Sequence, residues 1–199
     1  MICAMVLAAG RSRRMGTQKL LLPVRGEPMI ARVVDELLLG GVDRVFVVTG
    51  KASQPILDAL AARPVHFVTN PHAEDEMLRS VRCGLTAMPE QTAAAMVALG
   101  DQPGITEDVV AELVRCFGTS GRGITGRGIV VPTYRGKRGH PLLFAMHYRD
   151  EILTQHDGRG LRGLLDAHPQ DVFELEVATS AVLEDVDTPE DYRREIGRL

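Results

Sequence analysis

The sequence lacks tryptophan, and aromatic residues make up only 4% of its 199 residues. Proteins that bind single-stranded nucleic acid usually stack bases on aromatic side chains and present a basic surface. Here 26 acidic residues outnumber 23 lysines and arginines, which gives a net charge of −3. The composition therefore argues against a nucleic-acid partner.

Cysteine is also scarce. The three cysteines, Cys3, Cys83 and Cys116, stand far apart and form no CxxC pair. An odd and scattered set is typical of a reducing compartment, with each side chain a small buried apolar group. The initial run MICAMVLAAG lacks the basic start of a signal peptide and is too short to span a membrane. We therefore expect a cytoplasmic protein with no membrane partner.

Common nucleotide-binding and hydrolytic motifs are missing as well. Five residues separate Gly10 from Gly16, and Lys19 follows three positions later, which does not fit the P-loop pattern GxxxxGK[ST]. The dinucleotide-binding pattern GxGxxG does not occur. No Ser-His-Asp or Cys-His arrangement is recognisable, so the sequence gives no sign of a covalent nucleophile.

What the chain does have is a regular alternation of short apolar runs and helical apolar stripes. The runs predict buried parallel strands, and apolar residues three and four apart predict helices. This β-α order predicts an α/β three-layer sandwich, with a mainly parallel, Rossmann-like sheet between two layers of helices. The expected strands are 2–8, 44–50, 65–68 and 93–100, and the expected helices are 28–39, 55–62, 77–88 and 106–117.

The pattern changes after residue 118. A glycine-rich loop covers 118–128, and two apolar runs flank a turn at 135–137, which predicts a β-hairpin in the carboxyl-terminal part. No repeat or shift in composition divides the chain, so we expect one domain over residues 1–199. The later elements are expected as strands at 129–134, 140–146, 172–177 and 182–186, and helices at 147–154, 160–167 and from Pro189 onward.

The loop after the first strand, LAAGRSRRMGTQKLL (7–21), concentrates three arginines and one lysine around two glycines. In open α/β sheets, ligands bind at the carboxyl ends of the strands, where this loop begins. Glycines let backbone N–H groups approach a phosphate, and the cations neutralise its charge. We therefore expect this loop to bind phosphates, with a solvated basic turn as the alternative.

Two acidic motifs are candidates for a metal site. ALGDQPG (98–104) places Asp101 directly after an apolar run. Mg²⁺ prefers one or two carboxylates together with substrate phosphates. LEDVDTPEDY (183–192) places Asp185 and Asp187 two residues apart, so that on a strand they share one face, and we take Asp187 as the second ligand. A turn or a helix cap is the alternative reading of each motif.

Two further motifs combine cations with glycine. YRGKRGHPLLF (134–144) offers three cations and His140 to a second anionic ligand, although a histidine before proline is most often a structural hydrogen-bonding residue. DGRGLRGLLD (157–166) opens a helix, for which Asp157 is a candidate cap.

Taken together, these motifs occur in the order found in the MobA-like nucleoside-triphosphate transferases. The opening loop reads LAAG-x-S-x-R-M-G-x-x-K-x-L-L-P, and its alanine-alanine form resembles the molybdenum-cofactor cytidylyltransferases. The resemblance covers essentially the whole chain and implies the nucleotide-diphospho-sugar transferase type of fold. It also implies Mg²⁺-dependent transfer of CMP from CTP to the phosphate of molybdopterin, with a molybdenum hydroxylase as the partner that receives the product.

The resemblance also implies the role of each site residue. Arg14, Lys19 and Asp101 are the catalytic residues, and Asp101 and Asp187 hold the metal. The implied nucleotide-binding residues are Leu7, Ala8, Ala9, Gly10, Arg11, Ser12, Gly16, Lys19, Thr49, Asn70 and Ser80. The implied acceptor-binding residues are Arg138, Gly139, His140 and Pro141.

One segment departs from the family pattern. Where the family has a stretch of the kind EGMxSSLRxGL close to the nucleotide, this chain reads EDEMLRSVRCGL (74–85). Glu76 stands at a glycine position and Arg79 at a serine position, whereas Ser80 is kept. A glutamate there is expected to obstruct the nucleotide or to change which base is read.

Several functions remain open at this stage. The alanine-alanine start favours cytosine over guanine, but a guanylyl or other nucleotidyltransferase with a different phosphorylated acceptor is one alternative. A non-catalytic molybdenum-cofactor carrier is another, and nucleotide binding without pyrophosphate release would indicate it. A reductase recruited from this scaffold is the third. NADH oxidation with a dye would indicate that one, and the missing GxGxxG counts against it.

Overall fold

The computed structural model describes residues 1–10, 18–51, 53–72, 76–118 and 127–197. Its centre is a sheet with the strand order β10-β7-β9-β6-β1-β4-β5, and β8 pairs with β7 at the side. The strands of this sheet are β1 (Ile2–Ala8), β4 (Arg44–Thr49), β5 (Val65–Thr69), β6 (Ala94–Leu99), β7 (Ile129–Tyr134), β8 (Lys137–Arg138), β9 (Leu142–Ala145) and β10 (Val172–Glu176). A separate two-stranded sheet pairs β2 (Pro23–Val24) with β3 (Glu27–Pro28).

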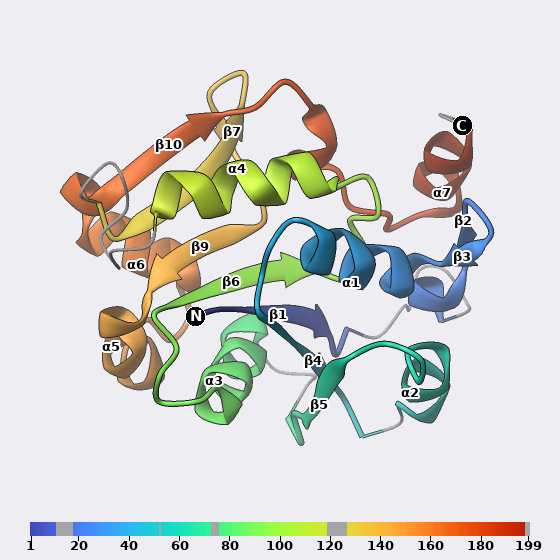
Figure 1. Ribbon diagram of the computed structural model, residues 1–199, viewed down its shortest axis with the longest axis horizontal. Coiled ribbons are helices and arrows are strands. Elements are labelled where there is room, and N and C mark those ends of the chain that lie inside the picture. The colour runs from blue at the N-terminus through green and yellow to red at the C-terminus, as the bar shows by residue number, and fades with distance from the viewer. Residues whose placement is uncertain (11–17, 52, 73–75, 119–126, 198–199) are drawn as a thin grey trace.

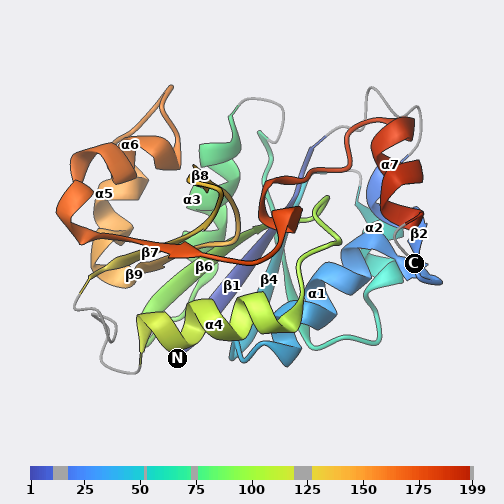
Figure 2. The same cartoon turned by 90° about the horizontal axis from the view of Figure 1, so that it is seen from above.

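Helices cover both faces of the sheet, as Figure 2 shows from above. On one face lie α1 (Met29–Leu39) and α4 (Glu107–Phe117), and on the other lie α3 (Met77–Ala87) and α5 (Arg149–Thr154). The remaining helices are α2 (Gln54–Ala59), α6 (Leu161–Ala167) and α7 (Pro189–Ile196), and the 3-10 turns are η1 (Lys19–Leu21), η2 (Met146–Tyr148), η3 (Pro169–Asp171) and η4 (Ser180–Leu183). The chain is therefore the three-layer α/β sandwich that the sequence predicts.

The sheet is mostly parallel. Strand β1 pairs in parallel with β4 and β6, and β7 pairs in parallel with β10. Strand β9 lies antiparallel to both β6 and β7. The carboxyl ends of β1 and β6 therefore meet at one edge of the sheet, which faces α7 at the right of Figure 1.

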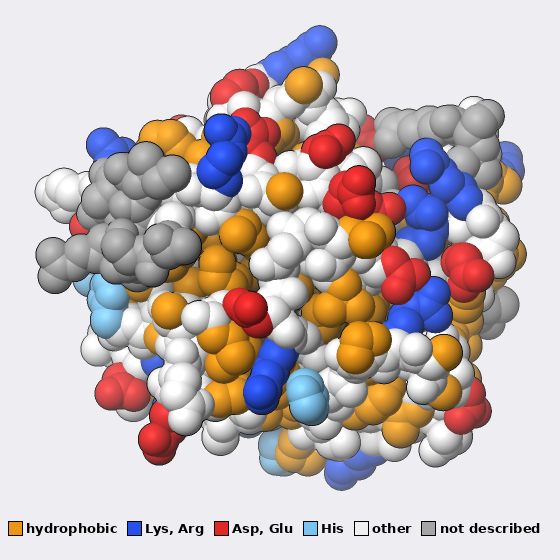
Figure 3. Space-filling view, in the orientation of Figure 1, with side chains coloured by type: hydrophobic (Ala, Val, Ile, Leu, Met, Phe, Trp, Pro, Cys, Tyr) orange, Lys and Arg blue, Asp and Glu red, His pale blue; other side chains and the backbone are white. Residues whose placement is uncertain are grey.

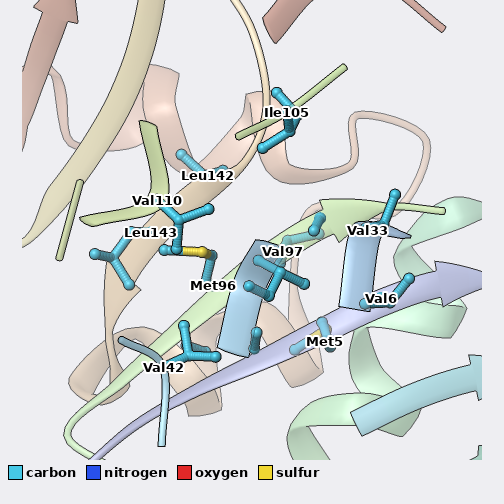
Figure 4. Close-up of a cluster of buried hydrophobic side chains, with 14 of the residues drawn as sticks. Met5, Val6, Val33, Val42, Met96, Val97, Ile105, Val110, Leu142 and Leu143 are labelled. Atoms are coloured by element: carbon cyan, nitrogen blue, oxygen red, sulfur yellow. The ribbon is translucent and has the colours of Figure 1, made fainter. Parts of the chain in front are cut away.

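The core lies between the sheet and its helices. Figure 4 shows a cluster of buried side chains that includes Val6 of β1, Met96 of β6 and Val110 of α4. Close approach between layers depends on small residues. A Cβ atom on Gly40, at the end of α1, would lie 2.4 Å from Cβ of Val110, so only glycine lets α1 and α4 pack this closely.

Most predicted elements are confirmed, with small shifts at their ends. The predicted hairpin is present, because Tyr134 pairs with Lys137 across a turn in which Arg135 and Gly136 both have positive φ. The strand predicted at 182–186 is wrong. Residues 180–183 form η4 instead, and the following residues join no ladder. The short β2–β3 pair was not predicted from the sequence.

The surface agrees with the near-balanced composition. Acidic, basic and apolar side chains are interspersed over the face seen in Figure 3. Among the described residues, no helix is both long enough and apolar enough to cross a membrane.

Candidate active site

Two carboxylates and one ammonium group meet at the carboxyl edge of the sheet. Lys19, at the start of η1, donates from Nζ to Asp101 Oδ2 at 2.6 Å and to Asp187 Oδ1 at 2.7 Å. Asp101 stands two residues after the end of β6, and Asp187 stands two residues before α7. Three loops that are far apart in the sequence therefore converge on one cation.

The cluster is partly shielded from solvent. The side chains of Lys19, Asp101 and Asp187 are 12%, 22% and 40% exposed. Burial disfavours the charged ammonium, but hydrogen bonds to the two carboxylates outweigh it and raise the pKa of Lys19. The lysine is therefore charged at neutral pH and neutralises part of the acidic pair.

The donor set suits a divalent cation. Asp101 and Asp187 each direct one carboxylate oxygen at the same nitrogen atom, so the two oxygens already face a common cation position. Mg²⁺ commonly takes one or two carboxylates and completes its shell with water and substrate phosphates. Within the described ranges, no group of three or more His, Cys, Asp or Glu residues has the arrangement of an all-protein metal site. The residues fit a metal that is shared with a phosphate substrate.

Asp185 takes a different position from Asp187. It does not lie on a strand, and its Oδ1 accepts a hydrogen bond from Gln102 Nε2 at 2.7 Å. Burial raises the pKa of Asp185, the nearby charge of Asp101 adds to this, and the hydrogen bond from Gln102 acts in the opposite direction. The prediction that Asp185 and Asp187 share one face of a strand is thus wrong, because the segment bends around the β6 loop.

The opening loop leaves β1 beside this cluster. Ala8 is buried, Leu7 and Ala9 are half-buried, and Gly10 is exposed. A Cβ atom on Gly10 would have no atom of the described residues within 4 Å, so these residues leave open space next to the end of β1. The described part of the loop is therefore accessible to a ligand. Four predicted site residues, Arg11, Ser12, Arg14 and Gly16, lie outside the described residues.

Three other predicted nucleotide-binding residues lie together at the ends of β4 and β5. Asn70 donates from Nδ2 to Ser80 Oγ at 2.9 Å, and its backbone N–H donates to Thr49 O at 2.8 Å. All three residues are buried. Their hydrogen bonds hold the β5 loop against α3, so the contacts shown here are structural.

The departure from the family pattern has a definite place in the structure. Glu76 precedes α3, and its Oε2 accepts a hydrogen bond from the backbone N–H of Gly158 at 3.2 Å. Arg82, on the same helix, donates from Nη1 to Asp157 Oδ1 at 2.8 Å and from Nη2 to the Gln155 carbonyl at 2.7 Å. Glu76 and Arg82 thus both bind the loop before α6. Asp157 does not cap α6, whose N-cap is Gly160.

The predicted acceptor residues are dispersed. Arg138 is exposed and pairs with Glu174 on β10 at 2.7 Å. A Cβ atom on Gly139 would lie 2.1 Å from the carbonyl oxygen of Val182, so this position admits only glycine. The hairpin that carries Arg138 is therefore fixed to β10 on one side and to η4 on the other.

His140 is half-buried, and Pro141 beside it is buried. Burial lowers the pKa of His140, against the opposing effects of a hydrogen bond to the Val97 backbone and of the charges of Asp185 and Asp101. Its Nδ1 has no hydrogen-bond partner among the residues that the structure describes. The structure thus brings His140 next to the acidic cluster and leaves Arg138 outside it.

Sequence reasoning missed two residues that organise the site. Gln102 is 2% exposed and holds Asp185. Arg82 binds three acceptors around the end of α5. In the sequence, the only sign of a role for Gln102 is that it is a polar residue directly after Asp101, in a motif that follows a buried strand.

Comparison with known proteins places this geometry among nucleotidyltransferases. A sequence profile of the MobA-like NTP transferase domain matches residues 4–172. The nicotine blue oxidoreductase of Paenarthrobacter nicotinovorans is 29% identical over 196 residues, covering 97% of this chain and 95% of that protein. The molybdenum cofactor cytidylyltransferase of Escherichia coli K12 is 24% identical over 192 residues, covering 96% and 93%.

Among solved structures, Rv0371c of Mycobacterium tuberculosis superimposes with a TM-score of 0.85 and 28% identity, covering 98% of this chain and 97% of that one. A second structure of Rv0371c is described as a complex with manganese, with a TM-score of 0.79 and 27% identity, covering 100% of this chain and 99% of that one. A divalent cation is therefore found in a protein of this architecture.

Proposed function

Because the chain belongs to the family of MobA-like NTP transferase domains, we propose that it transfers a cytidylyl group from CTP to the phosphate of molybdopterin and releases pyrophosphate. One observation supports this proposal above the others. Lys19, which follows the glycine- and arginine-rich segment in the sequence, joins Asp101 and Asp187 at the carboxyl edge of the sheet. One cation for a triphosphate, Lys19, and two carboxylates for a metal thus support a catalytic site at this sheet edge, in what we take to be one nucleotidyltransferase domain over residues 1–199.

In the proposed reaction, an oxygen of the molybdopterin phosphate attacks the α-phosphorus of CTP. The bond from that phosphorus to the bridging oxygen of the β-phosphate breaks, and pyrophosphate leaves with the electron pair. A phosphate monoester is already largely ionised at neutral pH, because its second pKa is about 6. The reaction therefore needs no protein base, in agreement with the lack of a recognisable nucleophile–base arrangement.

The chain supplies positioning and neutralisation of charge. Arg14 and Lys19 hold the triphosphate, and the strand end Leu7–Gly10 lies against the nucleoside. Asp101 and Asp187 would hold the cofactor Mg²⁺, which would neutralise charge on the phosphates. His140 and Gly139 border the acceptor side, with Arg138 and Pro141 shaping the hairpin around it. A molybdenum hydroxylase is the partner that takes the product.

The alanine-alanine start of the loop supports cytosine as the base. The Glu76 carboxylate accepts a hydrogen bond from the Gly158 backbone and so binds the loop before α6. That contact supports a nucleotide site that glutamate does not obstruct.

Pyrophosphate release tests the proposal. CTP, GTP and ATP are each incubated with molybdopterin and Mg²⁺, and a coupled assay measures the pyrophosphate formed. Release with CTP that depends on molybdopterin is expected, with much less from GTP or ATP. Release with GTP alone would identify guanine, and not cytosine, as the base. Binding of CTP with no release of pyrophosphate would indicate a carrier instead.

A second candidate is reduction, since the nicotine blue oxidoreductase aligns over nearly the whole chain. NADH oxidation in the presence of a quinone-type dye tests it. Oxidation that requires the protein and is insensitive to CTP would favour this function over nucleotidyl transfer.

A further inference from the structure

Two loops at the site are joined at two points. The backbone N–H of Val186 donates to the Asp101 carbonyl at 2.9 Å, and Gln102 Nε2 donates to Asp185 Oδ1 at 2.7 Å. Adjacent residues of the β6 loop therefore each bind adjacent residues of the segment before α7.

The orientation of Gln102 is determined by its partner. A carboxylate only accepts hydrogen bonds, so the amide nitrogen must face Asp185. The amide oxygen, Oε1, is buried and has no partner in the described part of the chain. Because Gln102 is only 2% exposed, solvent offers its amide no alternative to this bond.

The other side of Asp187 is also anchored. Thr188 and Asp191 form a capping box at the start of α7, in which Thr188 N donates to Asp191 Oδ2 at 2.9 Å and Asp191 N donates to Thr188 Oγ1 at 3.1 Å. Asp187 stands between this box and the contacts of Asp185 and Val186. Its carboxylate thus faces the one on Asp101 because the backbone is held on both sides.

From this arrangement we infer that Gln102 and Asp185 are positioning residues: their hydrogen bond orients the segment so that Asp187, and not Asp185, completes the metal-binding pair with Asp101. This inference rests on the metal site of the proposed function. It assigns different roles to two aspartates that are separated by one residue, and it gives a physical reason why Asp187 is the ligand of the two.

Manganese binding to the whole protein, without nucleotide or acceptor, tests the roles. The free Mn²⁺ signal in electron paramagnetic resonance gives the dissociation constant of each variant. Asp187→Asn is expected to weaken binding at least about thirtyfold, because a ligand is lost. Asp185→Asn keeps an oxygen that accepts from Gln102, so its affinity should stay within about threefold of the wild type. Asp185→Ala loses that oxygen and should bind about tenfold more weakly.

Gln102→Leu removes the hydrogen bond and keeps every carboxylate, and it should also weaken Mn²⁺ binding about tenfold. Its matched control is Gln54→Leu, which breaks a Gln–Asp bond of 2.8 Å to Asp58 on the exposed surface of α2 and should change nothing. In an Asp185→Ala background, Gln102→Leu should have almost no further effect, because the two residues act through one contact.

Three outcomes would overturn the inference. The first is a loss in Asp185→Asn as large as that in Asp187→Asn, which would make Asp185 itself a ligand. The second is unchanged affinity in Gln102→Leu. The third is a wild type that binds no Mn²⁺ while its melting curve shows a folded protein. If Gln102→Leu does not fold, the contrast between Asp185→Asn and Asp185→Ala decides. Since no CTP or acceptor is present, the predicted Mn²⁺ pattern can hold even where cytidylyl transfer fails, so the two failures are distinguishable.

Discussion

Replacing Lys19 by methionine should strengthen metal binding while it weakens nucleotidyl transfer. The ammonium of Lys19 contacts both carboxylates that we assign to the metal. A divalent cation and this ammonium therefore compete for Asp101 and Asp187. Methionine keeps most of the length of the lysine side chain and removes its charge, so it removes the competitor without opening a large gap.

The size of the effect follows from the exposure of each pair. Lys19 and Asp101 are 12% and 22% exposed, and a hydrogen bond to a charged group contributes about 1.5–3 kcal/mol in such surroundings. Asp187 is 40% exposed, so solvent screening limits its pair with Lys19 to at most about 1 kcal/mol. A total gain of about 2 kcal/mol corresponds to roughly thirtyfold tighter metal binding.

Titration with Mn²⁺ in the absence of nucleotide measures this change. Lys137→Met is the control, because it removes the same charge from an exposed position on the hairpin. Pyrophosphate release from CTP by Lys19→Met should fall at least about tenfold, since the triphosphate loses a cation. If Lys19→Met binds Mn²⁺ no more tightly than the control does, the Lys19 ammonium does not compete with the metal for Asp101 and Asp187.

Two further predictions concern stability. Gly139→Ala should lower the free energy of unfolding by about 2–4 kcal/mol, because the added Cβ meets the Val182 carbonyl. Gly136→Ala in the same hairpin meets no atom of the part of the chain that the structure describes and should lose only about 1 kcal/mol for its positive φ; equal losses in urea unfolding would contradict this. Burial raises the pKa of Glu151, but hydrogen bonds from two histidines outweigh it and lower the pKa below the ordinary value. The carboxylate therefore stabilises the fold above the unfolded-state pKa, and this contribution is lost as the pH falls through the folded-state pKa. Glu151→Gln should be about 1–3 kcal/mol less stable at pH 7, and the gap should close in unfolding curves recorded below the folded-state pKa of Glu151; a gap independent of pH would be inconsistent with this.

Much of the fold could be predicted because its elements have strong periodicity. The apolar run 2–8 becomes β1 with the same ends, and the stripe after Pro28 becomes α1. The position of β9 between β6 and β7 could not be predicted, because an antiparallel insertion leaves no mark on periodicity. Residues 182–186 were predicted as a strand, yet the Val186 N–H bonds to the carbonyl of Asp101 in a loop and not to a neighbouring strand.

The candidate site could be predicted only in part: its motif residues were found in the sequence, but the contacts between them were not. The family resemblance paired Asp101 with Asp187, but only Asp101 follows a strand of the parallel sheet, whereas Asp187 follows η4 and residues that join no strand. That Lys19 joins them depends on separations of 82 and 168 residues, which no local pattern contains. The burial of Gln102 and its bond to Asp185 likewise arise only when the loops pack together.

In the proposed function, Asp101 at this sheet edge supports transfer of a nucleotidyl group from a triphosphate. The most direct test uses CTP labelled with ³²P at the α-phosphate, together with molybdopterin and Mg²⁺, and compares the wild type with Asp101→Asn. With the wild type, label should enter a molybdopterin dinucleotide. With Asp101→Asn, the rate should fall at least about a hundredfold while the melting curve stays cooperative. Label transfer at the wild-type rate by Asp101→Asn, or no transfer by the wild type from any triphosphate, would contradict it.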